Sequence, residues 1–306
     1  MKNPKEAKSS FLLLLTAFIW GLAFVAQRQG ADYVGTFTYN GVRFILGGLS
    51  LIPVVFALEK RDRSTAEKAA EDKRKIKLTY AASLVMGLIL FSASNLQQFG
   101  IEITGSAGKA GFITGLYTVI VPIAGFFLGR KVGVLTWVGA VLAVSGLYLL
   151  SVTNGLGSVG IGDVLLIIGA LFWTAHIMVI DRFAPKTYAI RISMLQFFVV
   201  GFLSLPLAFV FEDITVSGLS GAAMPIVYGG VFSAGVAYTL QVVGQRHVAP
   251  SKAAIIFSLE AFFAALGGAI ILGERMSARG YLGCALIFTA IILSQLPRGE
   301  KISRRS

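Results

Sequence analysis

The chain has 306 residues, of which 56% are hydrophobic and 14% charged, and 27 Lys and Arg against 15 Asp and Glu leave a formal charge of +12. Soluble domains carry about 25% charged and about 45–50% apolar residues, so this composition excludes a soluble single-core protein and a disordered chain. A single cysteine, Cys284, excludes a disulfide framework, and the two histidines lie too far apart in the sequence to suggest a metal site.

Apolar runs separated by polar breaks divide the chain into segments long enough to cross a bilayer. A spanning helix needs about 20 mostly apolar residues, and unbroken runs favour helices over barrel strands. The first run has no convincing cleavage site, so we interpret it as a retained span rather than a signal peptide. The sequence thus predicts an all-α polytopic membrane protein with ten transmembrane helices, at 10–28, 35–58, 78–98, 104–128, 133–151, 161–180, 189–211, 221–244, 250–272 and 278–296.

The basic residues fall on alternate connections between these spans. With the N-terminus in the cytoplasm, most Lys and Arg lie on the cytoplasmic side, and only Arg28, Arg275 and Arg279 lie on the opposite side. Cytoplasmic connections of membrane proteins are enriched in Lys and Arg. We therefore expect an integral protein of the plasma (inner) membrane with both termini in the cytoplasm, and the net charge requires no nucleic-acid partner.

Residues 59–77 form the one long polar connection, in which basic and acidic residues alternate irregularly. Basic segments beside a membrane attract anionic lipid headgroups at about 1 kcal/mol per residue, but here the acidic residues dilute the patch. We favour a solvated orientation signal, part of which can be helical.

The two halves of the chain resemble each other. The segment around Trp20 (LTAFIWGLAFVAQR) aligns with the segment around Trp173 (IGALFWTAHIMVIDR), Lys109 matches Lys252, and the pattern LG-x(9)-G recurs near the end of both halves. Each half has five spans, an odd number, so the second copy lies upside down, as the exchanged signs of charge in matching connections also indicate. Inverted repeats of this kind are typical of alternating-access transporters. We expect two inverted five-helix repeats, 1–155 and 156–306.

These features together resemble the EamA-like branch of the drug/metabolite transporter superfamily. The resemblance rests on the two five-helix halves, a Trp in the first helix of each (FIWGLAF and LFWTAHI), Arg43-Phe44 in the second helix and LGER at the end of the ninth, and it covers essentially the whole chain. The sequence departs from the usual pattern at Arg130, where Glu is common, and at Ala261, where Pro is common. The resemblance implies a ten-helix carrier of small metabolites, amino acids or drugs.

Glu260 lies near the middle of the ninth predicted span. A charged group at the centre of a membrane helix costs about 2.5–3.5 kcal/mol, so it normally faces the bundle interior and has a partner. Glu260 could take up a proton or bind an ammonium group, and the alternative is a fixed ion pair that joins two helices. We favour the functional interpretation.

Three basic residues, Arg43, Lys109 and Lys252, also fall within predicted spans. They are candidates for binding an anionic group or for pairing with Glu260. Both Lys residues lie within two turns of a helix end, so extension of their side chains to the interface is an equal alternative. Lys252 precedes Glu260 by about 12 Å along the helix axis, which argues against a direct bond but lets both residues border one cavity.

Four aromatic residues, Trp20, Trp173, Tyr117 and Tyr238, are candidates for the walls of a pocket. Aromatic residues near span ends usually anchor a helix at the membrane interface, but these lie well inside their spans. Plain packing in the bundle is the equal alternative.

Two amides and one imidazole complete the candidate site. Gln98 and Gln241 lie near the ends of spans, where hydrogen bonding between helices is the default role. His176 is the one imidazole at membrane depth; it could relay protons, although a hydrogen-bonded core histidine is the more common case.

The sequence therefore predicts a secondary active transporter that exports a small metabolite, amino acid or drug by alternating access, with proton coupling at Glu260. An intramembrane enzyme would need clustered catalytic groups, and no motif joins His176 to Glu260, so we do not expect an enzyme; a channel-like permease is the third alternative. The expected partners are a small-molecule substrate, bilayer lipids and a coupling proton or ion. No P-loop or ATPase motif occurs, and we expect no cofactor and no metal.

Overall fold

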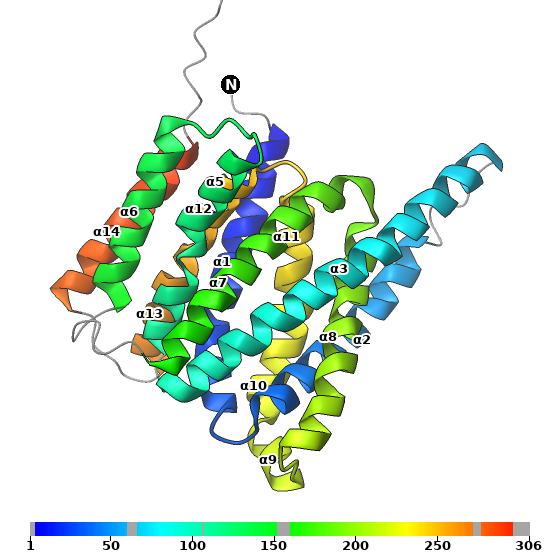
Figure 1. Ribbon diagram of the computed structural model, residues 1–306, viewed down its shortest axis with the longest axis horizontal. Coiled ribbons are helices and arrows are strands. Elements are labelled where there is room, and N and C mark those ends of the chain that lie inside the picture. Colours follow the sequence, from blue (N-terminus) through cyan, green and yellow to red (C-terminus); the bar gives the residue numbers. More distant parts are fainter. Residues whose placement is uncertain (1–3, 60–65, 106, 152–159, 272–276, 296–306) are drawn as a thin grey trace, which may run out of the picture.

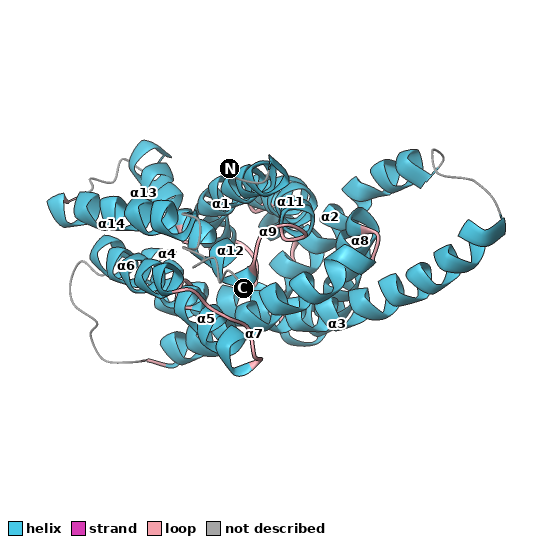
Figure 2. Cartoon of the chain, turned by 90° about the horizontal axis from the view of Figure 1, so that it is seen from above, coloured by secondary structure: helices cyan, strands magenta, loops and turns pink. Residues whose placement is uncertain are grey.

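The computed structural model describes residues 4–59, 66–105, 107–151, 160–271 and 277–295. In these residues all regular structure is helical, as the sequence predicts. Figure 1 shows the helices packed into one bundle, and Figure 2 shows the same bundle from above.

The first helices agree with the predicted spans but run further. α1 (Pro4–Gly30) and α2 (Thr36–Glu59) are joined by a short turn. α3 (Ala66–Thr104) has 39 residues, which corresponds to about 58 Å of helix against about 30 Å for the hydrocarbon core of a bilayer. The polar connection 59–77 is thus helical from Ala66 onward, and this end of α3 projects from the bundle in Figure 1.

Two spans that the sequence predicts as continuous are interrupted. The predicted span 104–128 consists of α4 (Ala107–Thr114) and α5 (Tyr117–Phe127), and the predicted span 250–272 consists of α12 (Pro250–Phe257) and α13 (Leu259–Ile271). Each of these predicted spans is thus two successive helices, and the stretch Ala110–Phe127 is still long and apolar enough to cross a membrane.

Tighter backbone hydrogen bonds explain both interruptions. The N–H of Thr118 donates to the carbonyl of Gly115 at 3.0 Å, and the N–H of Ala261 donates to that of Ser258 at 3.4 Å. These bonds join residues three apart, as in a 3₁₀ turn, instead of four apart as in an α-helix. Hydropathy alone records only an apolar run at both places.

The eighth predicted span is a continuous run of helix that changes from α-helix to π-helix and back. After the short α9 (Val216–Gly221), it runs through α10 (Ala223–Val227), the π-helix η2 (Tyr228–Tyr238) and α11 (Thr239–Gly244). π-Helical turns are rare and occur frequently at functional sites.

The remaining spans agree with the sequence prediction. They are α6 (Val134–Ser151), α7 (Ile161–Phe183), which continues into the short 3₁₀ helix η1 (Ala184–Lys186), α8 (Ala189–Phe211) and α14 (Ala278–Gln295). In the described residues seven helices are long and apolar enough to cross a membrane, and α6 and α14 are shorter apolar helices. The count of ten spans stays a prediction, since neither piece of the interrupted ninth span is long enough alone.

Helices from the two parts of the chain interleave in the bundle. α2 packs on α8, α3 on α7 and α6 on α14, while α1 lies against η2, α11 and α13. The predicted boundary between the repeats, 155/156, lies outside the described residues. Large apolar side chains such as Phe127, Phe209 and Ile270 cover the outer surface, as expected for helix faces that contact lipid.

Candidate functional site

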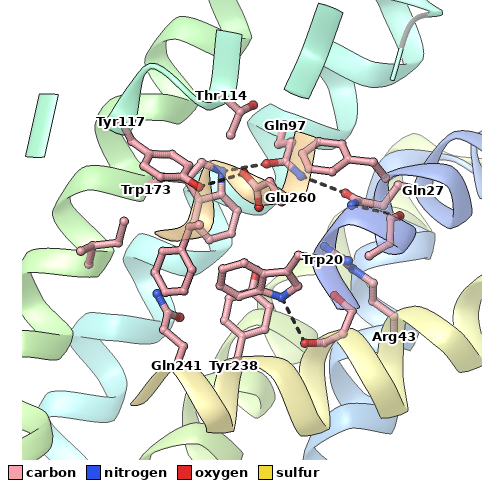
Figure 3. A pocket seen from close by; sticks show the side chains of 15 residues that line it. Trp20, Gln27, Arg43, Gln97, Thr114, Tyr117, Trp173, Tyr238, Gln241 and Glu260 are labelled. Atoms are coloured by element: carbon pink, nitrogen blue, oxygen red, sulfur yellow. Dashed lines mark hydrogen bonds between the residues drawn. The ribbon is translucent and has the colours of Figure 1, made fainter. Parts of the chain in front are cut away.

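A small cavity lies in the bundle interior, beside the interruptions of the two broken spans (Figure 3). Side chains from α1, α2, α3, α7, η2 and α11 line it together with residues next to both interruptions. The predicted site residues that it brings together are Trp20, Arg43, Tyr117, Trp173, Tyr238, Gln241 and Glu260.

One face of α1 forms a side of this cavity. Trp20, Ala23, Phe24 and Gln27 all line it, and their spacing of three and four residues places them on the same face of the helix. Gly21 brings the opposite helix close, because a Cβ atom there would lie 2.7 Å from the carbonyl oxygen of Glu260. α1 therefore contacts the backbone of α13 directly.

The two interruptions bring a tyrosine and a carboxylate together. Tyr117 is the second residue after Gly115, and Glu260 is the second residue after Ser258. The Tyr117 hydroxyl donates a hydrogen bond of 2.9 Å to Oε1 of Glu260. Glu260 is 5% exposed and, within the described part of the chain, has no basic side chain within 4.0 Å. The described residues thus do not form the fixed ion pair that was the structural alternative.

Aromatic rings form a wall beside this pair. The ring of Tyr238 lies 4.7 Å from that of Trp20 and 6.1 Å from that of Trp173, measured between centroids. Phe257 lies 5.3 Å from the Trp20 ring. Tyr238 and Trp173 are buried, so the rings both pack against one another and face the cavity.

A chain of amides runs along another side. The indole N–H of Trp173 donates to Oε1 of Gln97 at 2.9 Å, and Nε2 of Gln97 donates to Oε1 of Gln27 at 3.1 Å. Gln98 lies behind this chain, where its Nε2 donates to the backbone carbonyl of Gln27 at 3.1 Å. These bonds tie α7, α3 and α1 together, so Gln98 has the inter-helix role that the sequence suggested as the default.

Some polar groups at the cavity have no protein partner. Both side-chain polar atoms of Gln241 and the hydroxyl of Thr114 are buried and lack a hydrogen-bond partner among the described residues. Buried polar groups are nearly always hydrogen-bonded, so these groups are suited to binding a solute or water in the cavity.

The cavity is small in this conformation. Its volume is about 30 Å³, and a single water needs about 10–15 Å³ on the same scale. It can thus hold a few water molecules but no metabolite. A solute could occupy this place only after the surrounding helices move apart.

The other predicted site residues lie elsewhere. His176 is fully buried behind the aromatic wall, with its Nε2 3.0 Å from Oε1 of Gln196. Lys252 does not border the cavity, because its Nζ lies 2.8 Å from Oε1 of Glu6 at the start of α1. The expectation that Lys252 borders the same cavity as Glu260 is thereby corrected. Lys252 lies in the first turn of α12, and its side chain points to the end of the bundle. The side chain of Lys109 lies outside the described residues.

The site candidates predicted from the sequence leave out four lining residues, namely Gln27, Gln97, Thr114 and Ser233; of these, Gln97 was expected only to form hydrogen bonds between helices near a span end. The predicted spans ended too early: α3 runs to Thr104 rather than to residue 98, so Gln97 lies well inside the helix rather than at its end. Amides inside a long apolar helix are the signal that could have identified Gln27 and Gln97. Ser233 contributes its backbone carbonyl, 3.4 Å from the Trp20 indole nitrogen, which no side-chain pattern reveals.

Comparison with known proteins identifies the family. The model of the EamA-like transporter family matches residues 7–152 and again residues 160–296. The chain therefore belongs to the EamA-like transporter family. Together with its apolar helices, this makes it an integral membrane protein.

Similar proteins extend over nearly the whole chain. An uncharacterized transporter of Archaeoglobus fulgidus is 30% identical over 96% of this chain and 88% of its own length. The uncharacterized transporter YwfM of Bacillus subtilis is 25% identical over 95% of both chains. A crystal structure with 16% sequence identity covers 94% of this chain and 96% of its own with a TM-score of 0.73, which supports the fold alone.

Proposed function

We propose that this protein is a secondary active transporter that exports a small molecule across the plasma membrane by alternating access. In this proposal both termini lie in the cytoplasm, the central cavity is the closed form of the solute site, and Glu260 exchanges a proton during the cycle. The two halves of the chain, 1–155 and 156–306, are inverted repeats that rock against each other around the site.

The observation that carries the proposal is the contact between Tyr117 and Glu260. These residues are 143 positions apart, and the same offset relates Lys109 to Lys252 and the interruption at Gly115 to that at Ser258. They are therefore equivalent positions of the two halves. Equivalent positions touch each other only at the axis that relates two repeats, and transporter sites lie at such an interface, near interrupted helices.

The packing of the helices supports the same symmetry. The first helix of the first half, α1, packs on the eighth span, and the first helix of the second half, α7, packs on the third span, α3. The matched tryptophans of these first helices, Trp20 and Trp173, both line the cavity. The contact of α1 with the eighth span thus has its counterpart in the contact of α7 with the third span.

The chemistry of the pair suits coupling. The Tyr117 hydroxyl donates a hydrogen bond to Glu260 in the closed state and so links the two interrupted spans across the axis. Opening the cavity to either side separates these spans, and Glu260 then meets water or solute and can gain or lose a proton. A carboxyl at membrane depth without a basic partner is a default candidate for such a role.

Reconstituted protein tests this proposal. Uptake into inside-out vesicles or proteoliposomes is measured over a range of pH for solutes that stabilise the purified protein against heat. We expect saturable transport with counterflow, and we expect Glu260→Gln to abolish its pH dependence while Glu102→Gln, at the far end of α3, preserves it. Unchanged rate and pH profile in Glu260→Gln would refute the coupling role, and flux without saturation or counterflow would favour a channel.

A further inference from the structure

Arg43 carries a buried positive charge that the described part of the protein does not neutralise. The residue is 2% exposed, near the first third of α2, and no carboxylate of the described residues lies within 4.0 Å of its guanidinium. Its Nε donates to Oδ1 of Asn40 at 2.9 Å, and neither terminal nitrogen has a protein acceptor among these residues. An unpaired buried charge is costly, so it normally has a counter-ion or a function.

The surroundings hold this side chain in place. The guanidinium carbon lies 4.6 Å from the ring centroid of Phe44 and 5.2 Å from that of Tyr39, in cation–π geometry. Gly229 of the π-helix makes room for it, because a Cβ atom there would lie 3.1 Å from Cδ of Arg43. Figure 3 shows the side chain extending from α2 toward the cavity beside Trp20. The guanidinium is thus fixed at the cavity rather than folded into the bundle.

We propose that the transported solute carries a carboxylate and that Arg43 binds it. A guanidinium offers parallel N–H donors that match the two oxygens of a carboxylate. Its one bonded nitrogen faces Asn40, which leaves the terminal nitrogens for the solute. This inference rests on the proposed transport function and specifies the class of solute.

The rest of the cavity favours an organic anion over an inorganic one. The rings of Trp20 and Tyr238 offer an apolar surface for a carbon skeleton, and the unpartnered amide of Gln241 offers both a donor and an acceptor. Chloride could accept a hydrogen bond from the amide N–H but would use neither the ring faces nor the amide oxygen. The alternative ligand for the Arg43 guanidinium is chloride, and the test below compares it with carboxylates.

Thermal unfolding of the purified full chain in detergent tests the proposal without knowledge of the natural solute. The probes are the sodium salts of small aliphatic, aromatic and amino-substituted carboxylic acids, the primary amides of the same acids, and sodium chloride, all at equal ionic strength. We expect one or more carboxylates to raise Tm by about 2–4 °C and the matching amides to have no effect. Equal shifts from the amides, a full shift from chloride alone, or no shift from any carboxylate would overturn the proposal.

Three variants identify the residue that binds the probe. Arg43→Gln is expected to lose the carboxylate-dependent shift, and Arg43→Lys is expected to keep part of it, because the charge remains. Asn40→Ala removes the partner of Nε but leaves the guanidinium, so it should keep the shift. If Arg43→Gln does not fold, Arg43→Lys and Asn40→Ala still test the proposal. Loss of the carboxylate-dependent rise in Tm in both of these variants would mean that Arg43 has a structural role.

The outcome is separable from that of the transport proposal. A reconstituted protein that shows saturable, Glu260-dependent transport of uncharged or purely cationic solutes would leave the transporter assignment intact. It would overturn the binding role of Arg43.

Discussion

Among single residues, Tyr117 and Glu260 form the contact on which the transport proposal depends most. Tyr117→Phe removes the hydroxyl donor and keeps the ring. A hydrogen bond to a charged group contributes about 1.5–3 kcal/mol, and one to a neutral group about 1 kcal/mol. We expect a loss of about 1–3 kcal/mol in the free energy of unfolding and slower transport, measured by denaturant unfolding and by uptake. Tyr80→Phe, at an exposed position of α3, is the matched control and should change neither; equal effects would contradict the role of the pair.

Two glutamines at the cavity are expected to respond differently to the same substitution. Gln97 links Trp173 to Gln27, whereas neither polar atom of the Gln241 side chain has a hydrogen-bond partner in the described part of the chain. Gln97→Leu should lower the free energy of unfolding by about 1–3 kcal/mol, since it leaves buried partners unpaired. Gln241→Leu should leave it unchanged or raise it in the absence of solute. Similar losses in both variants, measured in the same detergent, would show that Gln241 is a structural residue.

Sequence reasoning could identify most of the polar and aromatic residues at the cavity, because ionisable and amide side chains inside apolar runs are conspicuous. It could not show which of them meet. Glu260 and Lys252 lie on the same predicted span, yet the carboxylate contacts Tyr117 of the other half and the amine contacts Glu6. These pairings depend on the crossing of helices distant in sequence, which hydropathy does not encode.

At the scale of elements, close approach between α1 and α13 sets the shape of the site. A Cβ atom on Gly21 would lie 2.4 Å from Cβ of Phe263 and 2.7 Å from the carbonyl oxygen of Glu260. Gly21→Ala should therefore cost about 1–3 kcal/mol through overpacking. Gly111 of α4 has nothing within 4 Å of the same added atom, so Gly111→Ala should stabilise by about 0.5–1 kcal/mol. Thermal unfolding of both variants measures these changes, and we expect a lower Tm for Gly21→Ala and a higher Tm for Gly111→Ala. A higher Tm for Gly21→Ala would contradict the close contact between α1 and α13.

The start of α2 depends on a carboxylate from the end of α8. Glu212 accepts hydrogen bonds from the backbone N–H groups of Phe37 at 2.7 Å and Thr38 at 2.8 Å. These are free donors of the first helical turn, and loss of such a cap typically costs about 1–2 kcal/mol. Glu212→Ala should destabilise by this amount, whereas Asp213→Ala, next to it and exposed, should have little effect. Equal unfolding midpoints for the two variants would exclude the capping role.

The spans themselves were predictable, because long apolar runs between charged connections leave few alternatives. The interruptions at Gly115 and Ser258 were not predictable, because no proline and no run of charged residues marks either place. Their tighter turns are stabilised by the packing of the two broken spans against each other and against α1 and α7. In η2, Gly230 lies close to the backbone of α2, since a Cβ atom there would lie 2.8 Å from the carbonyl oxygen of Arg43.

For the whole molecule, the distribution of charge predicts an orientation. Arg130, Lys131 and Lys252 lie together at one end of the bundle, and Asp32 lies in the turn between α1 and α2 at the other end (Figure 1). The enrichment of basic residues in cytoplasmic connections predicts that the first end faces the cytoplasm. In a Cys284→Ala background, a membrane-impermeant thiol reagent applied to intact cells should label Asp32→Cys and spare Lys131→Cys. The reverse pattern would invert the proposed topology.

The central claim is that one cavity opens in turn to both sides of the membrane. Ser233 is 2% exposed and lines the cavity, so a cysteine placed there in the Cys284→Ala background reports on access to the site. The decisive measurement is its labelling in proteoliposomes by an impermeant thiol reagent added to the outside only or to the inside only. The account predicts labelling from each side, slowed by a transported solute. Labelling from one side only, at every pH and solute concentration, would contradict it.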